Sequence, residues 1–287
     1  MEVDGKTQLV GIIGYPIDYT LSPAIHNAAF RALGMNWLYV PLRVEPGKGE
    51  AGIAGLRALG FKGANVTIPH KTEVVPCLDE LRGDALTLEA ANTVVSEGGR
   101  LVGYNTDAAG FEAFLRQTEL ETEGSNVLLI GAGGASRAVA LALARSGAAR
   151  IYVMNRTARK AGELAALLKR ANFSSEIFER TFDQQGAQVM RECEVVINCT
   201  PLAAVDASEL PLDYGDFRPG QWAIDLNYSK AMPAFLGEAS SRGARVANGV
   251  GMLLHQAAES FRLWTGEEPP LEAMKLALRK ALGDSGG

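Results

Sequence analysis

Polar side chains that could bind and protonate a small ligand follow several apolar segments in the N-terminal part of this chain. They are Asn65, Thr67, Lys71, Asn92 and Asp107. Because the carboxyl ends of parallel strands face the crevice where open α/β sheets bind ligands, we expect these side chains to lie close together. They predict a pocket for a polyhydroxylated ligand, with one amine and one carboxylate. The alternatives are ordinary: Lys71 as a solvated surface lysine and Asp107 as a helix N-cap.

A glycine-rich segment lies near the middle of the chain. The apolar residues 126–130 lead into Gly131-Ala-Gly-Gly-Ala-Ser136, a helical pattern follows over 137–145, and a second apolar run covers 150–154. This order predicts a strand, a glycine turn, a helix and a parallel strand. Without Cβ atoms, the turn can bring backbone N–H groups against a pyrophosphate at the helix N-terminus.

Basic residues follow the second of these strands. An NAD-binding unit would place an acid there for the ribose hydroxyls, whereas this chain has Asn155-Arg156-Thr157, with Lys160 one turn later. Arg156 and Lys160 would favour a 2′-phosphate through charge and hydrogen bonding, which predicts NADP as the cofactor. The alternative is a solvated basic start of the next helix.

Composition limits the classes of function. The 287 residues carry a net charge of −5 and are 47% hydrophobic, which describes a globular protein with no reason to bind nucleic acid or an anionic membrane. No apolar stretch has membrane-spanning length. Three dispersed cysteines and three histidines do not form a zinc ligand set, so we expect no metal and reduced thiols in a cytoplasmic setting.

The elements that must position the N-terminal polar residues alternate along the chain. Strands are expected over 9–14, 37–44 and 63–68, with a helix over 52–59 between the last two and a hairpin formed by 91–95 and 100–104. Ser22 followed by Pro23 predicts the cap and first residue of another helix. A helix from Pro69 to about Leu81 is expected to carry Lys71, and another covers 108–117.

The remaining segments predict a doubly wound sheet. Residues 158–170 are helical, and buried strands are expected over 194–200 and 222–226. Residues 245–251 lead into a helix over 252–264 that places Met252 and Gln256 on one face, and an amphipathic helix covers 271–282. The fold class is α/β with two domains. One domain is expected over 1–107, and a Rossmann-type cofactor domain over 108–250.

Together these motifs resemble the shikimate dehydrogenase family over nearly the full length. The segments that carry the resemblance are residues 19–27, 65–71, 91–93, 105–107, 131–135, 155–157 and 251–256. The resemblance implies reversible, NADPH-dependent reduction of 3-dehydroshikimate to shikimate on the route to aromatic amino acids. It also implies that 1–107 is the substrate domain, completed by the C-terminal helices of 251–287, which fold back onto it. A monomer or a homodimer is expected.

The resemblance also implies roles for individual residues. Lys71 and Asp107 would be the catalytic pair. The substrate would contact Thr20, Ser22, Asn65, Thr67, Lys71, Asn92, Asp107, Tyr228 and Gln256. The cofactor would contact Gly131, Ala132, Gly133, Gly134, Ala135, Asn155, Arg156, Thr157, Lys160, Thr200, Leu226, Gly249 and Met252.

Some positions depart from the family pattern. Thr20 stands where serine is usual, and its extra methyl could shift preference among shikimate, quinate and amino analogues. Residues 227–230 replace an expected Tyr-Asn-Pro. Two alternatives therefore stay open: a quinate/shikimate or aminoshikimate dehydrogenase, and a non-catalytic NADP-binding sensor on the same fold. Retention of both Lys71 and Asp107 argues against the sensor.

Overall fold

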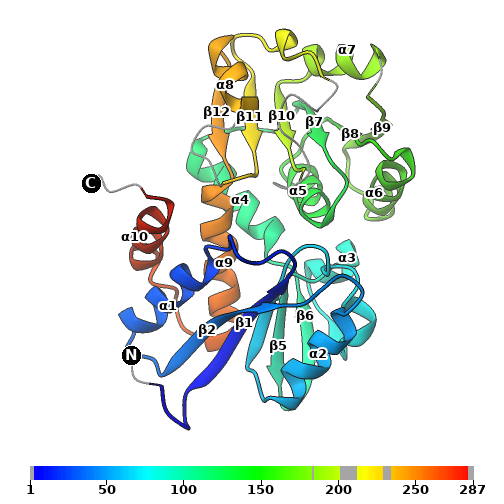
Figure 1. Cartoon of the computed structure of the whole chain (residues 1–287). Helices are drawn as coiled ribbons and strands as arrows, with labels where there is room; N and C mark the ends of the chain where they lie inside the picture. The colour runs from blue at the N-terminus through cyan, green and yellow to red at the C-terminus, as the bar shows by residue number, and fades with distance from the viewer. Residues whose placement is uncertain (1–2, 183, 201–211, 229–233, 284–287) are drawn as a thin grey trace. The chain divides into compact units, whose positions relative to one another are not determined.

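The computed structural model describes residues 3–182, 184–200, 212–228 and 234–283, and these form two compact units (Figure 1). The first unit comprises Met1–Gly110 and Leu253–Gly287, and the second is Phe111–Met252. The chain passes from one unit to the other within helix α4 (Asp107–Thr118) and again within α9 (Val250–Thr265). The first unit is therefore built from both ends of the sequence.

The first unit contains a six-stranded sheet in the order β2-β1-β3-β5-β6-β4. Strands β1 (Gln8–Gly14), β2 (Trp37–Arg43) and β3 (Gly63–Val66) pair in parallel. The expected hairpin is confirmed as β5 (Thr93–Glu97) and β6 (Arg100–Tyr104), with β5 antiparallel to both β3 and β6, and β4 (Glu80–Leu81) parallel to β6. This pairing places the residues before β5 and after β6 side by side.

Helices cover this sheet with the apolar faces that their sequence patterns predict. On α2 (Gly49–Ala58), Ile53 and Leu56 pack into a core with strand residues such as Val66 and Val94. Aromatic rings of α1 (Ser22–Ala32) and α9 pack together, as in the contact of Phe30 with Phe261. Helix α10 (Leu271–Leu282) lies against α1 (Figure 1). A short helix, α3 (Asp84–Leu88), precedes β5.

The helix expected from Pro69 to about Leu81 is wrong. Residues 69–74 form turns, a single 3₁₀ turn covers Val75–Cys77, and β4 begins at Glu80. Pro76 lies within the 3₁₀ turn and supplies no backbone N–H, so an α-helix could not continue through it. Lys71 is therefore presented by a turn rather than by a helix N-terminus.

The second unit is a parallel six-stranded sheet in the order β12-β11-β10-β7-β8-β9. The predicted strands appear as β7 (Asn126–Ile130), β8 (Arg150–Met154), β10 (Val195–Asn198) and β11 (Trp222–Asp225). The sequence analysis did not identify β9 (Glu176–Arg180) and β12 (Arg245–Asn248) as strands. Numbered along the chain, this order is 3-2-1-4-5-6, which reverses direction between β7 and β10.

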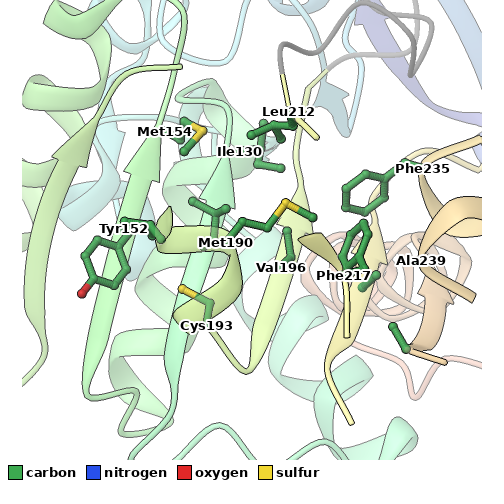
Figure 2. Close-up of a cluster of buried hydrophobic side chains, with 14 of the residues drawn as sticks. Ile130, Tyr152, Met154, Met190, Cys193, Val196, Leu212, Phe217, Phe235 and Ala239 are labelled. Carbon is green, nitrogen blue, oxygen red and sulfur yellow. The ribbon is translucent and has the colours of Figure 1, made fainter. Parts of the chain in front are cut away.

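Helices connect the parallel strands of the second unit. They are α5 (Gly134–Arg145), α6 (Ala158–Arg170), α7 (Gln184–Glu192) and α8 (Ala234–Ser241). Met190 of α7 and Phe235 of α8 belong to one apolar cluster with Ile130 and Met154 (Figure 2). Burial on both faces explains why the central strands read as continuous apolar runs.

The segment 227–230, which departs from the family pattern, is described only in part. Residues 229 and 230 lie outside the described residues. No helix within the described ranges is long and apolar enough to cross a membrane.

Candidate active site and cofactor site

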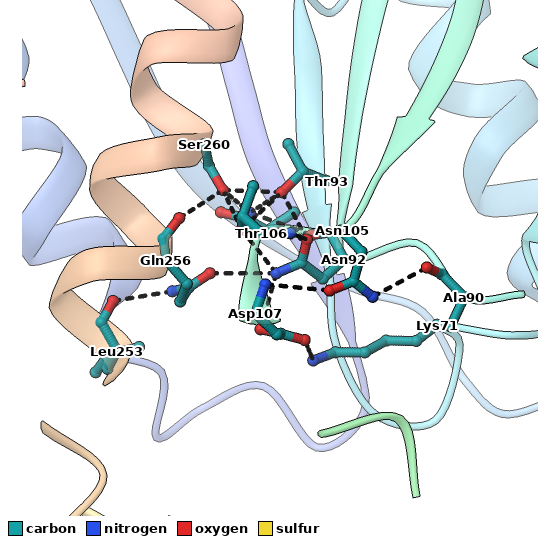
Figure 3. A network of polar contacts seen from close by, with 11 residues as sticks. Lys71, Ala90, Asn92, Thr93, Asn105, Thr106, Asp107, Leu253, Gln256 and Ser260 are labelled. Atoms are coloured by element: carbon teal, nitrogen blue, oxygen red, sulfur yellow. Dashed lines mark hydrogen bonds and ion pairs between the residues drawn. The ribbon is translucent and has the colours of Figure 1, made fainter. Parts of the chain in front are cut away.

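A buried ion pair joins two segments of the first unit. Lys71 Nζ lies 2.6 Å from Asp107 Oδ2, and the two side chains are 15% and 6% exposed (Figure 3). At this depth solvent screens the pair only weakly. An ammonium held beside a carboxylate can give a proton to a ligand oxygen or, once neutral, take one from it. The pair is the candidate chemical centre of this unit.

The turn that carries Lys71 is anchored on both sides. The fully buried His70 ring has Nδ1 2.7 Å from Glu73 Oε2 and Nε2 2.8 Å from Val44 O. The hydrogen bond with His70 is the main reason that the pKa of Glu73 lies below its ordinary value. On the other side, Ala91 N–H donates to Lys71 O at 2.8 Å. These contacts fix the backbone of Lys71 without a helix.

Asn92 sets the orientation of the aspartate. Its Nδ2 donates to Asp107 Oδ1 at 2.8 Å and to Thr106 Oγ1 at 2.9 Å, while Thr106 N–H donates to Asn92 Oδ1 at 2.8 Å. A backbone N–H can only donate, so the amide oxygen must face Thr106 and the amide nitrogen must face Asp107. Asp107 thereby keeps its other oxygen for Lys71.

Gln256 and Thr67 come from different elements. Gln256 on α9 is 9% exposed, donates to Leu253 O at 3.0 Å, and has Oε1 3.4 Å from Asn92 Nδ2. The partly exposed Thr67 follows β3, and its hydroxyl makes no hydrogen bond to the described residues. Gln256 therefore joins the Asn92–Asp107 cluster, whereas the Thr67 hydroxyl is free to meet a ligand.

Asn65 is buried in the protein's own hydrogen-bond network. Its Oδ1 accepts from Tyr39 OH at 2.7 Å, and its Nδ2 donates to Ser260 Oγ at 3.0 Å and to Thr93 Oγ1 at 3.2 Å. Only 4% of the residue is exposed. The amide is satisfied by protein groups, which favours a supporting role over direct ligand contact.

Thr20 and Ser22 lie together at the start of α1. Ser22 N–H donates to Thr20 Oγ1 at 3.3 Å. The expectation that Ser22 caps the helix is wrong, because Leu21 occupies the N-cap position and no side chain makes a capping hydrogen bond. Ser22 is the first helical residue, and its hydroxyl makes no hydrogen bond within the described part of the chain. Capping therefore no longer explains this serine.

The glycine turn of the second unit follows β7, beside the point where the strand order reverses. Gly131 has φ +108, which favours glycine, and a Cβ there would lie 3.3 Å from the Cys199 backbone carbon at the end of β10. Gly133 N–H donates to Ser136 Oγ at 3.2 Å. The N–H groups of Ala132, Gly134 and Ala135 donate no hydrogen bond within the described ranges, so they remain available to an anion.

The basic residues after β8 are exposed. Arg156, Thr157 and Lys160 all face solvent, and Asn155 Nδ2 donates to Thr157 O at 3.0 Å, which shapes the turn. Neither Arg156 nor Lys160 forms an ion pair with the described residues. Two exposed cations at the carboxyl end of β8, with no acidic partner in the described ranges, fit the 2′-phosphate of NADP.

The ends of β10, β11 and β12 carry the other expected cofactor contacts. Thr200 Oγ1 donates to Asn198 Oδ1 at 2.6 Å, and Asn198 Nδ2 donates to Asp225 Oδ2 at 3.2 Å. Burial raises the pKa of Asp225. A Cβ on Gly249 would lie 2.1 Å from Leu226 O, so these two loops touch only because residue 249 is glycine.

The second unit also contains Tyr228, an expected substrate contact, and Met252, an expected cofactor contact. Tyr228 is half-buried after β11, and Met252 is 7% exposed as the last residue of the unit.

The sequence patterns did not single out the buried hydroxyl groups that support the Asn92–Asp107 cluster. Thr93, Thr106 and Ser260 are 0%, 2% and 0% exposed and hydrogen bond to Asn92, to Asn65 or to one another. A signal existed for each: Thr93 and Thr106 are chain neighbours of Asn92 and Asp107, and Ser260 is one helical turn after Gln256. Residue type alone did not distinguish them from ordinary buried hydroxyls.

Comparison with known families covers most of the chain. Residues 12–94 match the family described as "Shikimate dehydrogenase substrate binding domain", and residues 114–205 match "Shikimate / quinate 5-dehydrogenase". Residues 249–279 match "Shikimate 5'-dehydrogenase C-terminal domain". The matched segments include Lys71, the glycine turn and Gln256.

Individual relatives extend over the whole length. The shikimate dehydrogenase (NADP(+)) of Moorella thermoacetica is 43% identical, covering 100% of this chain and 98% of the relative. A crystal structure of a shikimate dehydrogenase in complex with NADP+ has a TM-score of 0.88 and 36% identity, covering 97% of each chain. The Thermus thermophilus enzyme, in complex with NADP(H) and shikimate, has a TM-score of 0.84 and 33% identity, covering 96% of this chain and 99% of that one. The chain therefore belongs to the shikimate dehydrogenase family.

Proposed function

We propose that this protein catalyses the reversible, NADPH-dependent reduction of 3-dehydroshikimate to shikimate in the biosynthesis of aromatic amino acids. The observation that carries the proposal is the buried contact of 2.6 Å between Lys71 and Asp107 in the substrate-binding part of the chain. A non-catalytic sensor on the same fold would have no reason to keep this pair buried and aligned.

The chemistry divides between the cofactor and the protein. NADPH supplies a hydride for the ring ketone. Lys71, as the ammonium, donates a proton to the oxygen that becomes the hydroxyl and stabilises the negative charge developing there. Asp107 holds the ammonium and orients the substrate hydroxyl, and it does not itself need to carry the transferred proton. In the oxidation of shikimate, neutral Lys71 accepts the proton.

Substrate binding is proposed for the groups that the fold leaves available. The Thr20 and Ser22 hydroxyls bind the substrate carboxylate, and the Thr67 hydroxyl is free for a ring substituent. Asn92 donates to Asp107 and Gln256 lies against Asn92, and both amides contact the ring hydroxyls. Tyr228 is proposed as a further substrate contact, while Asn65 acts through its neighbours.

Cofactor binding is proposed for the second unit. The free N–H groups of the glycine turn bind the pyrophosphate, and the turn from Asn155 to Thr157 binds the adenosine ribose, with Arg156 and Lys160 on its 2′-phosphate. Thr200, Leu226, Gly249 and Met252 line the nicotinamide side. The exposed cations, without an acid on the ribose, favour NADP over NAD.

The alternative within the same chemistry is a wider substrate range. The matched family includes quinate dehydrogenases by its description. Thr20 adds a methyl group at the proposed carboxylate end of the site, beside the ring carbon at which quinate differs from shikimate. A panel of shikimate, quinate and aminoshikimate, each with NADP and with NAD, separates these activities.

The direct test is an assay of the purified full chain. Mixing it with NADPH and 3-dehydroshikimate should oxidise NADPH and yield shikimate, identified chromatographically. Replacement by NADH, or by 3-dehydroquinate, should give a lower kcat/KM. NADPH binding without turnover of any dehydro acid would instead support the sensor. We further propose that the protein is cytoplasmic and that it is a monomer or a homodimer. Sedimentation of the purified protein distinguishes the monomer from the homodimer.

A further inference from the structure

A layer of buried hydroxyl groups lies against the Asn92–Asp107 cluster (Figure 3). Thr93 Oγ1 lies 2.8 Å from Ser260 Oγ, and Thr106 Oγ1 lies 3.2 Å from it. The three side chains come from β5, from the segment before α4 and from α9. Ser260 is therefore one of the contacts through which α9 meets the strand ends that carry the proposed catalytic residues.

The available hydrogens fix the direction of the bonds around Ser260. Its hydroxyl lies 3.0 Å from Gln256 O, a carbonyl that can only accept, so the single hydroxyl hydrogen is donated there. Ser260 Oγ must then accept from Asn65 Nδ2 at 3.0 Å and from the hydroxyl of Thr93 or Thr106. Together with the bond from Tyr39 OH to Asn65, this gives a directed chain that ends on the backbone of α9.

The same layer reaches the catalytic pair. Thr93 Oγ1 and Thr106 Oγ1 lie 2.9 Å and 3.2 Å from Asn92 Oδ1. Asn92 in turn donates to Asp107, which holds Lys71. Movement at Ser260 would therefore be transmitted by two routes: through Asn92 to the ion pair, and along one helical turn to Gln256.

We propose that Ser260 is a positioning residue for the reaction, a role that rests on the proposed function. It holds α9 in register with the strand ends, so that Gln256 and Asn92 keep Asp107 aligned with Lys71. Replacing the hydroxyl by hydrogen leaves Asn65 Nδ2 without one acceptor and the threonine layer without a shared partner. Buried polar groups left in this way reorient or move, because an unmet hydrogen bond is costly.

The alternative is that the Ser260 hydroxyl acts only within its own helix. Serine and threonine in helices often bond to the carbonyl four residues earlier with no further role. Thr265, on the same helix, makes this bond outside the Asn92–Asp107 cluster: its Oγ1 donates to Phe261 O at 2.8 Å and accepts from Glu267 N–H at 3.1 Å, just after the helix. Thr265→Val is therefore the matched control for Ser260→Ala.

The experiment compares the two variants with the parent in shikimate oxidation with NADP. Ser260→Ala should lower kcat about fivefold to tenfold, the effect of one lost buried hydrogen bond. It should also change the pH profile of kcat/KM, because the Lys71–Asp107 ion pair is no longer held in the parental geometry. Thr265→Val should keep the parental kcat and profile. Thermal unfolding confirms that each variant is folded.

A second variant tests the route of the effect. Thr93→Val is nearly isosteric and removes the strand side of the same contact, so its effect on kcat should be non-additive with Ser260→Ala. It also serves alone if Ser260→Ala does not fold. Parental kcat in both variants overturns the proposal. A loss of kcat also overturns it if the pH profile is unchanged and the effects of Ser260→Ala and Thr93→Val on kcat are additive. A parent that turns over no dehydro acid overturns the proposed function, and this role with it.

Discussion

Lys71 is the residue whose removal should separate chemistry from binding. We predict that Lys71→Ala lowers kcat by about 10²- to 10⁴-fold, because the proton donor and the charge beside the developing alkoxide are both lost. NADPH affinity should stay near the parental value, since the glycine turn belongs to the other unit. Stopped-flow turnover and NADPH fluorescence titration measure the two quantities.

Lys62→Ala is the control for Lys71→Ala. Lys62 is an exposed lysine of the same unit, so the change in net charge is identical while the buried ion pair is untouched. It should leave kcat unaltered. A Lys71→Ala enzyme that turns over at the parental rate would remove this lysine from the reaction.

Arg156 is the residue that we expect to set the preference between NADP and NAD. We predict that Arg156→Ala weakens NADP about 10- to 100-fold, the range for a lost charge-assisted hydrogen bond, and NAD much less. Arg159→Ala removes the same charge three residues later, where the guanidinium already pairs with Glu163, and should change neither affinity appreciably. Fluorescence titration with both cofactors measures the ratio. Equal losses for NADP and NAD would contradict the 2′-phosphate role.

For individual residues, the sequence indicates the candidate reacting groups better than the side chains that hold them in place. Lys71 and Asp107 were identifiable because each follows a strand, and the structure pairs them at 2.6 Å. Ser22 was assigned to capping on good grounds, yet its hydroxyl makes no cap. The threonine layer and Ser260 were missed because their value depends on contacts between residues as far apart as 93 and 260, which local sequence does not encode.

Among the elements, α4 and α9 approach each other closely at Gly110. A Cβ on Gly110 would lie 2.8 Å from both Cβ and N of Gln256. We predict that Gly110→Ala raises the KM for shikimate severalfold and lowers Tm, because the added methyl pushes α9 away from Asn92 and overpacking a tight contact is destabilising. Steady-state kinetics and calorimetry measure the two effects.

Gly55→Ala is the matched control for Gly110→Ala. Gly55 lies within α2 and has nothing within 4 Å of a Cβ. The substitution should raise stability slightly through helix propensity and leave KM unchanged. If Gly110→Ala behaves like this control, the close approach to Gln256 is not needed for substrate binding.

Elements were predictable where their residues follow one period and not where irregular structure interrupts it. The glycine turn with its flanking strands, α6 and α10 all appear where the patterns place them. The expected helix after Pro69 fails because Pro76 interrupts the backbone hydrogen bonds. The edge strands β9 and β12 were missed because their mixed burial gives no continuous apolar run.

For the molecule as a whole, both ends of the chain must meet to complete the first unit. Trp264 Nε1 donates to Val94 O at 2.9 Å, a contact between residues 170 positions apart. The unit therefore cannot finish folding until α9 has been synthesised. His26 lies in the same region, with its ring stacked on Tyr39 at 4.5 Å and 5.1 Å from the Trp264 ring.

The stability of the protein should depend on pH through this histidine. Burial lowers the pKa of His26 from 6.5 to about 3, so at pH values between these the unfolded chain binds a proton that the folded chain excludes. Stability is then complete above pH 6.5 and falls as the pH falls. The loss from this group should be about 2 kcal/mol between roughly pH 7 and pH 5, a window above most carboxyl titrations. His26→Phe keeps an aromatic ring without the titration and should show a shallower dependence. Urea unfolding at both pH values measures the free energy of unfolding. An equal loss of stability in the parent and in His26→Phe would show that His26 is not the source.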